Sequence, residues 1–136
     1  MQSKLLAATD ENMATVNDFI HSFLPEHCPF KVLNQIDLAV EEIYINIAHY
    51  AYKPNVGSVE ITCDTHNGDS EYTILIIFKD SGKPFNPLER QDPDITLSAE
   101  ERNIGGLGIY LTKQFMDEVK YEYKDGFNIL SIKKSF

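Results

Sequence analysis

The stretch that decides the fold is YTILIIFKDSGKPF, residues 72–85. Its first part, Tyr72 to Phe78, is nearly all apolar, which is typical of a strand inside a sheet with at least one covered face. Asp80 and Gly82 follow at once. An aspartate there can accept a hydrogen bond from an exocyclic amine such as that of adenine, and a glycine lets the backbone approach a flat ligand closely. An ordinary strand-end turn has the same composition.

A long helix is predicted from Phe30 to Tyr52. Its apolar stripe consists of Ile36, Val40, Ile43, Ile47 and Tyr50. At about 100° per residue, Glu41 points away from that stripe, whereas Glu42 and Asn46 share its flank and can face a cleft. A carboxylate there can act as a general base, and an amide oxygen can ligate Mg²⁺. The alternative is a solvated pair at a helix edge.

A glycine segment opens another helical pattern near the C-terminus. It consists of Gly105, Gly106, Leu107 and Gly108. A helix start offers free N–H groups and a partial positive charge, both of which suit a phosphate. The preceding stretch, about residues 86–104, is polar and acidic, and loops of this length are often functional lids. The glycines could instead be a hinge of that lid, and the two roles are compatible.

The remaining sequence indicates short strands and further helices within one domain, residues 1–136. Leu5 to Ala8 is a predicted strand, and Asp10 is a predicted N-cap of the following helix. Asn67-Gly68 predicts a hairpin turn with positive φ at both central residues, and Asp125-Gly126 predicts a second hairpin. The expected fold class is therefore α+β, a two-layer sandwich with a mixed, mostly antiparallel sheet and helices on one face.

Composition argues against several classes of partner. The formal net charge of −9 and the pI of about 4.8 disfavour binding to nucleic acid or to an anionic membrane surface. No apolar run approaches the roughly 20 residues of a membrane helix. The apolar stretch at the N-terminus is too short for a signal peptide. Two cysteines make a disulfide framework unlikely to form, so we expect a cytoplasmic protein with reduced thiols and with Cys63 in the core.

In this order, the three segments resemble the motifs of the GHKL ATPases, the superfamily of gyrase, MutL and the histidine kinases. The similar segments are Glu42-x-x-x-Asn46 for the N box, Asp80-x-Gly82-x-Pro84-Phe85 for the G1 box and Gly105-Gly106-x-Gly108 for the G2 box. Within the superfamily the chain is most similar to the anti-sigma factor serine/threonine kinases. That similarity extends over about residues 4–134.

The resemblance implies a Bergerat fold that binds Mg-ATP, with residues 86–104 as the ATP lid. It implies that Glu42 is the general base, that Asn46 ligates Mg²⁺ and that Asp80 contacts adenine. The implied nucleotide-binding residues are Asn46, Asp80, Gly82, Pro84, Phe85, Gly105, Gly106, Leu107 and Gly108. The implied substrate is a serine or threonine of a STAS-domain anti-sigma factor antagonist. The implied second partner is a sigma factor, and a homodimer is implied as well.

Two details depart from the family pattern. Ile45 and Ile47 stand where many of these kinases have threonine and alanine, and His49 follows Asn46 by three residues instead of four. Three functions stay open at this point. The first is a serine/threonine kinase that regulates a sigma factor. The second is an ATP-binding module that sequesters a partner without phosphorylating it, and the third is a domain without a nucleotide site.

Overall fold

The structure is a computed structural model that describes residues 1–89 and 107–136. In chain order its main elements are β1 (Gln2–Ala7), α1 (Met13–His21), α2 (Phe30–Asn46), β2 (Ser58–Asn67), β3 (Tyr72–Asp80), α3 (Leu107–Phe115), β4 (Glu118–Lys124) and β5 (Phe127–Ser135). Short turns of 3₁₀-helix cover Asp10–Asn12 and Pro87–Glu89, and a π-helix, Ile47–Ala51, follows α2.

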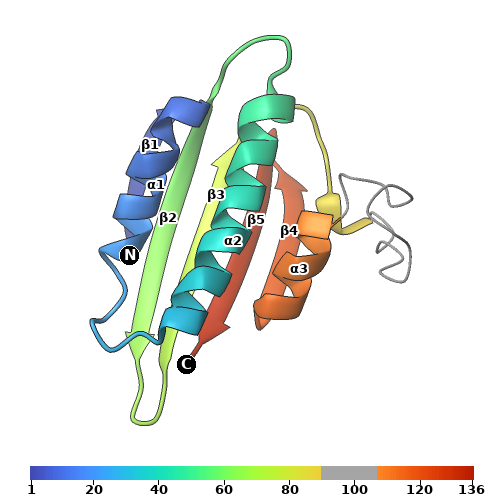
Figure 1. Ribbon diagram of the computed structural model, residues 1–136. Helices are drawn as coiled ribbons and strands as arrows, with labels where there is room; N and C mark the ends of the chain where they lie inside the picture. The colour runs from blue at the N-terminus through green and yellow to red at the C-terminus, as the bar shows by residue number, and fades with distance from the viewer. Residues whose placement is uncertain (90–106) are drawn as a thin grey trace.

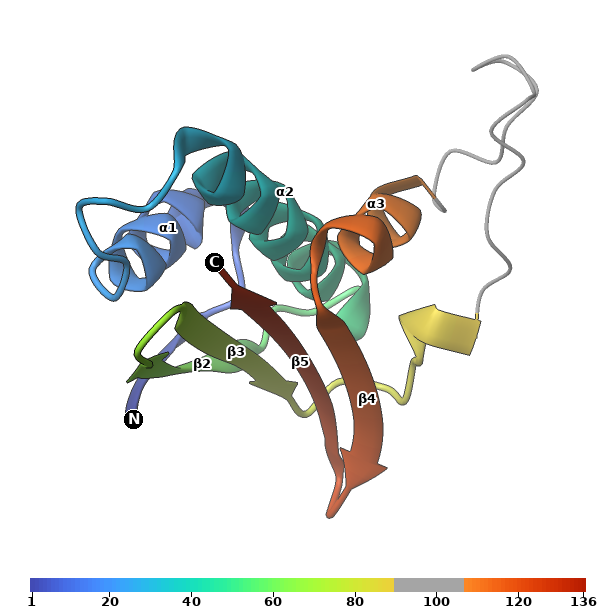
Figure 2. The ribbon, with the colours of Figure 1, turned by 90° about the horizontal axis from the view of Figure 1, so that it is seen from below.

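The five strands form one sheet in the order β1-β2-β3-β5-β4, and every neighbouring pair is antiparallel. The three α-helices lie on one face of this sheet, with α2 across its centre and α3 over β4 and β5 (Figures 1 and 2). The predicted two-layer α+β sandwich is therefore confirmed. The apolar strand β3 is central, as its composition predicts.

The core lies between the helices and the sheet. Its largest fully buried side chains include Tyr44 of α2, Phe78 of β3 and Ile132 of β5. Cys63, on the inward face of β2, is also fully buried, and burial raises the pKa of its thiol to about 12. The prediction that Cys63 is a core residue is confirmed.

The predicted helix from Phe30 to Tyr52 is wrong in its last turn. Regular α-helix ends at Asn46, and Ile47–Ala51 form a π-helix. Because π-helical hydrogen bonds join residues five apart, side chains beyond Ile47 move out of the phase that the apolar stripe assumes. Tyr50, predicted to lie on that stripe, is consequently 59% exposed.

Two local predictions at turns are corrected as well. Asp10 caps no helix through its side chain, and its carboxylate instead lies 2.6 Å from Nε2 of His49. Asn67 belongs to β2 and pairs with Tyr72, so residues 68–71 form a four-residue loop. This register pairs apolar residues of β2 and β3 and leaves the polar residues of the loop outside the sheet. Positive φ angles occur instead at Asp125 and Gly126, in the other predicted hairpin.

Candidate functional site

Three chain segments that carry the predicted motifs lie toward one end of the sandwich, and two pairs of them are in contact. The end of α2, the exit of β3 and the start of α3 all lie toward that end (Figure 1). Gly105 and Gly106 lie outside the described residues, as does the predicted lid from residue 90 to residue 104. The described part of the predicted lid is residues 86–89, which include the 3₁₀ turn Pro87–Glu89.

The helix row consists of Glu42 and Asn46 on the flank of α2. Both side chains are half-buried, whereas Glu41 is exposed, as the helix phase predicts. Nδ2 of Asn46 donates a hydrogen bond to Oε1 of Glu42, at 3.1 Å. Because the amide nitrogen faces the carboxylate, the amide oxygen of Asn46 points elsewhere, and no residue within 1–89 and 107–136 donates a hydrogen bond to it. This oxygen suits Mg²⁺, which prefers hard oxygen donors.

The first turn of α3 packs directly on the helix row. A Cβ atom added to Gly108 would lie 2.0 Å from Cδ of Glu42, so the glycine leaves the space that the carboxylate fills. The buried Thr112 bonds back to the carbonyl oxygen of Gly108, at 2.8 Å, which ties this turn together. Leu107, half-buried, begins the helix. The structure thus brings Glu42, Asn46 and Gly108 together, although α2 and α3 are distant in sequence.

Asp80 is the last residue of β3 and is almost completely buried, at 5% exposure. Its Oδ1 accepts hydrogen bonds from the backbone N–H of Gly82, at 2.9 Å, and from Nδ2 of Asn128, at 3.0 Å. Burial raises the pKa of Asp80, and the two hydrogen bonds oppose that rise. Such a group, held in place beside a turn, can recognise a donor on a ligand.

The turn after Asp80 is anchored to the end of the long helix. A Cβ atom added to Gly82 would lie 2.4 Å from the carbonyl oxygen of Ala51, and the N–H of Lys83 donates to that oxygen at 3.1 Å. The close approach at this glycine is therefore to protein backbone. The hydroxyl of Tyr52 accepts from the N–H of Ser81, at 2.8 Å, and donates to the carbonyl of Ser58.

Asn128 of β5 is a site residue that the motif analysis did not single out. It is 6% exposed, and its Nδ2 donates to Oδ1 of Asp80 and to the carbonyl oxygens of Gly82 and Lys83. Its Oδ1 accepts from the N–H of Phe85 at 3.1 Å. A sequence signal did exist, because Asn128 is the polar member of an inward-facing row that continues with the apolar residues Leu130 and Ile132.

Pro84 and Phe85 lie at the outer side of the turn. Both residues are exposed, Phe85 to 57%. The backbone of Phe85 is nonetheless fixed by its bond to Asn128. An exposed aromatic ring on a fixed backbone is available to pack against a flat ligand or against another chain segment.

Within residues 1–89 and 107–136, no group of three or more His, Cys, Asp or Glu side chains could hold a metal ion. A Mg²⁺ ion at this end would therefore need ligands besides the protein, as is usual where substrate phosphates and water complete its shell. The histidines described by the structure include two that lie against carboxylates, His21 beside Asp37 and His49 beside Asp10. None of the helices in the described part of the chain has the length and apolar character needed to cross a membrane.

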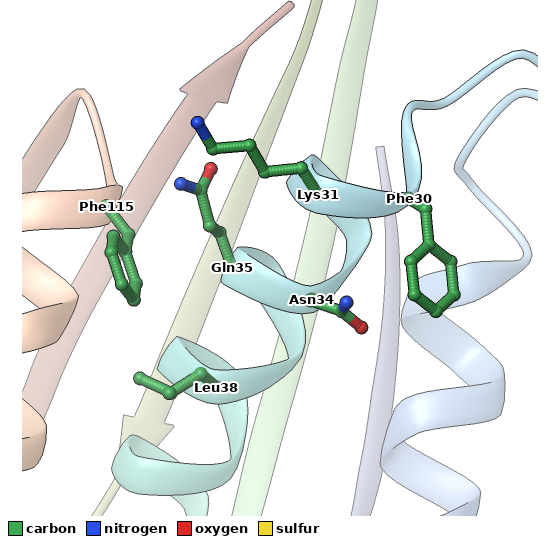
Figure 3. Close-up of a pocket in the computed structure, with 6 residues that line it drawn as sticks. All are labelled: Phe30, Lys31, Asn34, Gln35, Leu38 and Phe115. Atoms are coloured by element: carbon green, nitrogen blue, oxygen red, sulfur yellow. The ribbon is translucent and has the colours of Figure 1, made fainter.

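A separate open groove, of about 460 Å³, lies along the first half of α2. It is lined by Phe30, Lys31, Asn34, Gln35, Leu38 and Phe115. Figure 3 shows Gln35 and Leu38 extending from α2 toward Phe115 at the end of α3. None of the predicted site residues that the structure describes lines this groove, so it is distinct from the end of the molecule where Asn46 and Asp80 lie.

The chain is similar to proteins that are named as kinases and to one family of ATPase domains. A family model described as "Histidine kinase-like ATPase domain" matches residues 6–134. The serine-protein kinase RsbW of Bacillus thuringiensis (strain Al Hakam) is 30% identical over 105 residues, which are 74% of this chain and 63% of the relative. RsbW of Listeria innocua serovar 6a is 27% identical over 108 residues, 76% of this chain and 67% of the relative.

A solved structure has the same fold. It is the histidine kinase domain of the blue-light activated histidine kinase from Erythrobacter litoralis EL346. The match covers 93% of this chain and 63% of the chain in that structure, with a TM-score of 0.51 and 14% identity. At that identity the match shows the fold alone. The chain spans about 63% of the length of the RsbW protein from B. thuringiensis. The fold and the family match confirm the resemblance drawn from the three motifs, and the chain belongs to the histidine kinase-like ATPase domain family.

Proposed function

We propose that this chain is an ATP-dependent serine/threonine protein kinase of the anti-sigma type. The observation that carries the proposal is that the last part of the helix that begins at Phe30 contacts both other motif segments. Glu42 and Asn46 lie against the first turn of α3 at Gly108, and the Asp80 turn is anchored to the same end of the long helix at Ala51. An ATP-using phosphotransferase needs a general base, a ligand for the metal ion, a helix start that binds phosphate and a carboxylate that recognises adenine.

In the proposed reaction, the substrate hydroxyl attacks the γ-phosphorus and gives its proton to Glu42, while the bond from that phosphorus to the bridging oxygen breaks and ADP leaves. Asn46 would hold Mg²⁺ through its amide oxygen, because its Nδ2 is bonded to the Glu42 carboxylate. Asp80 binds the exocyclic amine of adenine, and the turn to Phe85 shapes that part of the site. Bound Mg²⁺ neutralises charge on the phosphates and orients them, and positioning provides most of the remaining catalysis.

The proposed site continues into residues that the structure does not describe. Gly105 and Gly106 would offer N–H groups to the phosphates, together with Leu107 and Gly108 at the start of α3. The segment from residue 86 to residue 104 would cover the nucleotide as an ATP lid. Both assignments come from the sequence motifs and from the family to which the chain belongs.

The proposed protein substrate is a serine or threonine of a STAS-domain anti-sigma factor antagonist, and the proposed second partner is a sigma factor. The relatives named serine-protein kinase RsbW support a serine kinase of this group. We further propose that the chain forms a homodimer and acts in the cytoplasm. The acidic net charge of −9 agrees with protein partners in preference to nucleic acid.

The test is incubation of the chain with Mg²⁺, labelled ATP and a STAS-domain protein encoded near its gene. Labelled phosphoprotein is expected with the wild-type chain. Glu42→Ala should abolish transfer and spare nucleotide binding, because in the proposed reaction the Glu42 carboxylate acts on the attacking hydroxyl and not on the nucleotide. The matched control is Glu41→Ala, which removes the exposed neighbouring carboxylate and should leave transfer unchanged.

The possible outcomes separate the candidate functions. Transfer that survives Glu42→Ala would show that the base assignment is wrong. Binding of ATP that changes partner affinity without forming phosphoprotein would identify a sequestering module instead of a kinase. Failure of the wild-type chain to bind Mg-ATP in calorimetry would refute the nucleotide site altogether.

A further inference from the structure

We propose that Asn128 is a positioning residue that makes the Asp80 turn selective for a base with an exocyclic amine, because it fixes which carboxylate oxygen of Asp80 faces the ligand. The proposal rests on the proposed function, in which Asp80 contacts the base. It adds a residue from the C-terminal hairpin to the site and assigns the choice of base to that residue.

The orientation of the Asn128 amide is fixed by its neighbours. The backbone N–H of Phe85 lies 3.1 Å from one end of the amide and can only donate, so that end must be the oxygen. The hydroxyl of Tyr121 donates to the same oxygen, at 2.5 Å. The other end faces Oδ1 of Asp80 at 3.0 Å and the carbonyl oxygen of Lys83 at 2.9 Å, both acceptors, so it must be the NH₂ group. The amide therefore cannot flip without losing these bonds.

This fixed amide determines how the Asp80 carboxylate presents itself. Oδ1 accepts from Nδ2 of Asn128 and from the N–H of Gly82, which directs two donors at one oxygen. Among the residues that the structure describes, no hydrogen bond engages Oδ2. The two donors favour the ionised carboxylate and so oppose the burial that raises the pKa of Asp80. Oδ2 is thereby kept as an acceptor for a ligand.

An acceptor at Oδ2 discriminates between purines. Adenine presents an amine at its six-position, which can donate to Oδ2, whereas hypoxanthine presents a carbonyl oxygen there. If that carbonyl oxygen faced Oδ2, both atoms would be acceptors and neither would have a hydrogen-bond donor. Leaving buried polar atoms without a partner weakens binding. Without the donor from residue 128, protonation of Asp80 is favoured, and a protonated carboxyl can donate to that carbonyl. Loss of Asn128 should therefore weaken the binding of ATP more than the binding of inosine triphosphate.

The experiment measures dissociation constants of ATP and inosine triphosphate for the whole chain, with Mg²⁺ present and at one pH. The wild-type chain should prefer ATP by about tenfold or more, the size expected for a hydrogen bond to a charged group. In Asn128→Asp, which keeps the side-chain shape but replaces the donor by an acceptor, the ratio of the two constants should fall toward one. Asn67→Asp adds the same charge at an exposed position of β2 and should leave the ratio unchanged.

Two further variants separate selectivity from a role in folding. Asn128→Leu removes the donor without adding charge, and thermal unfolding reports whether either variant is folded. Tyr121→Phe removes one hydrogen bond to the Asn128 oxygen and should lower the preference for ATP over inosine triphosphate less than the Asn128 variants do. Tyr123→Phe, on the exposed part of the same strand, is the control and should leave that preference unchanged.

Three results would overturn the inference. Equal loss of affinity for both nucleotides in folded Asn128 variants would mean that Asn128 merely braces the turn. A wild-type chain that binds both nucleotides equally would show that Asp80 does not read the six-position, while the proposed ATP site would stand. A wild-type chain that binds neither nucleotide would refute the proposed function itself and the inference with it.

Discussion

The two halves of the candidate site differ sharply in how the protein holds them. The turn after Asp80 is fixed by Asn128, by the backbone of Ala51 and by the hydroxyl of Tyr52. Among the residues that the structure describes, the side chains of the helix row share one hydrogen bond, from Asn46 to Glu42, and the Glu42 carboxyl packs on the backbone of Gly108. Within residues 1–89 and 107–136, the turn is thus held by more hydrogen bonds than the helix row.

This difference agrees with the chemistry proposed for each half. A surface that selects a base gains affinity when it is pre-organised, since little ordering remains for the ligand to impose. A general base and a metal ligand must instead adapt to a phosphate chain and its cation, so side chains with few hydrogen bonds suit these two roles. The comparison leads to the expectation that mutations in the turn change stability, whereas mutations in the row change activity.

The largest expected effect is that of Gly108→Ala on phosphoryl transfer. The new Cβ would occupy the position of the Glu42 carboxyl group, which must move aside. Transfer should fall by about 10²–10⁴-fold, the usual contribution of a general base, with little loss of stability because the displaced group ends a flexible side chain. Kinetic assays and thermal unfolding check both parts, with Gln114→Ala on the exposed face of α3 as control. Full activity in Gly108→Ala would contradict the proposed position of the base.

The next largest effect is that of Gly82→Ala on stability. Its Cβ would meet the carbonyl oxygen of Ala51 at 2.4 Å, and backbone atoms cannot rotate away. We expect a loss of about 1–3 kcal/mol in the free energy of unfolding, as for other overpacked sites, measured by urea denaturation. Ser81→Ala, at the neighbouring exposed position, should cost less. An unchanged urea midpoint would show that the turn accommodates a side chain at residue 82, which would contradict the close packing on Ala51.

A smaller loss is expected from Tyr52→Phe. The variant keeps the ring and removes the hydroxyl that joins Ser81 to Ser58. Removal should cost about 1 kcal/mol in the free energy of unfolding, since a typical intramolecular hydrogen bond contributes that amount. Tyr50→Phe is the matched control, because Tyr50 is 59% exposed in the adjoining π-helix. Equal effects of the two variants would mean that the hydroxyl does not anchor the turn.

The smallest expected effect is a pH dependence that comes from Asp80. Because burial raises the pKa of Asp80 in the folded chain, its contribution to stability is fully present below the unfolded pKa and is lost as pH rises through the folded pKa. Asp80→Asn cannot ionise and should therefore gain stability relative to wild type as pH rises above the ordinary aspartate value of 3.8. Urea unfolding of both proteins over a pH series measures this difference. A gap that stays constant with pH would contradict a raised pKa.

Sequence patterns predicted those features that depend on neighbours along the chain. The apolar run from Tyr72 to Phe78 gave the central strand, and the helix phase placed Glu41 outside and Glu42 on the flank. The pattern failed where local geometry changed. The π-helix at Ile47–Ala51 moved Tyr50 into solvent, and the pairing of β2 with β3 set a longer loop at Gly68 than the dipeptide indicates.

By itself, the sequence determined the α+β sandwich and the candidate residues of the site, because hydrophobic periodicity and motif spacing are properties of a linear chain. Only the tertiary structure decided what those residues touch. Gly82 meets Ala51, Gly108 meets Glu42, and Asn128 reaches the Asp80 turn from the C-terminal hairpin. Such contacts join segments far apart in sequence, and their geometry is set by packing of the helices on the sheet, which no local pattern encodes.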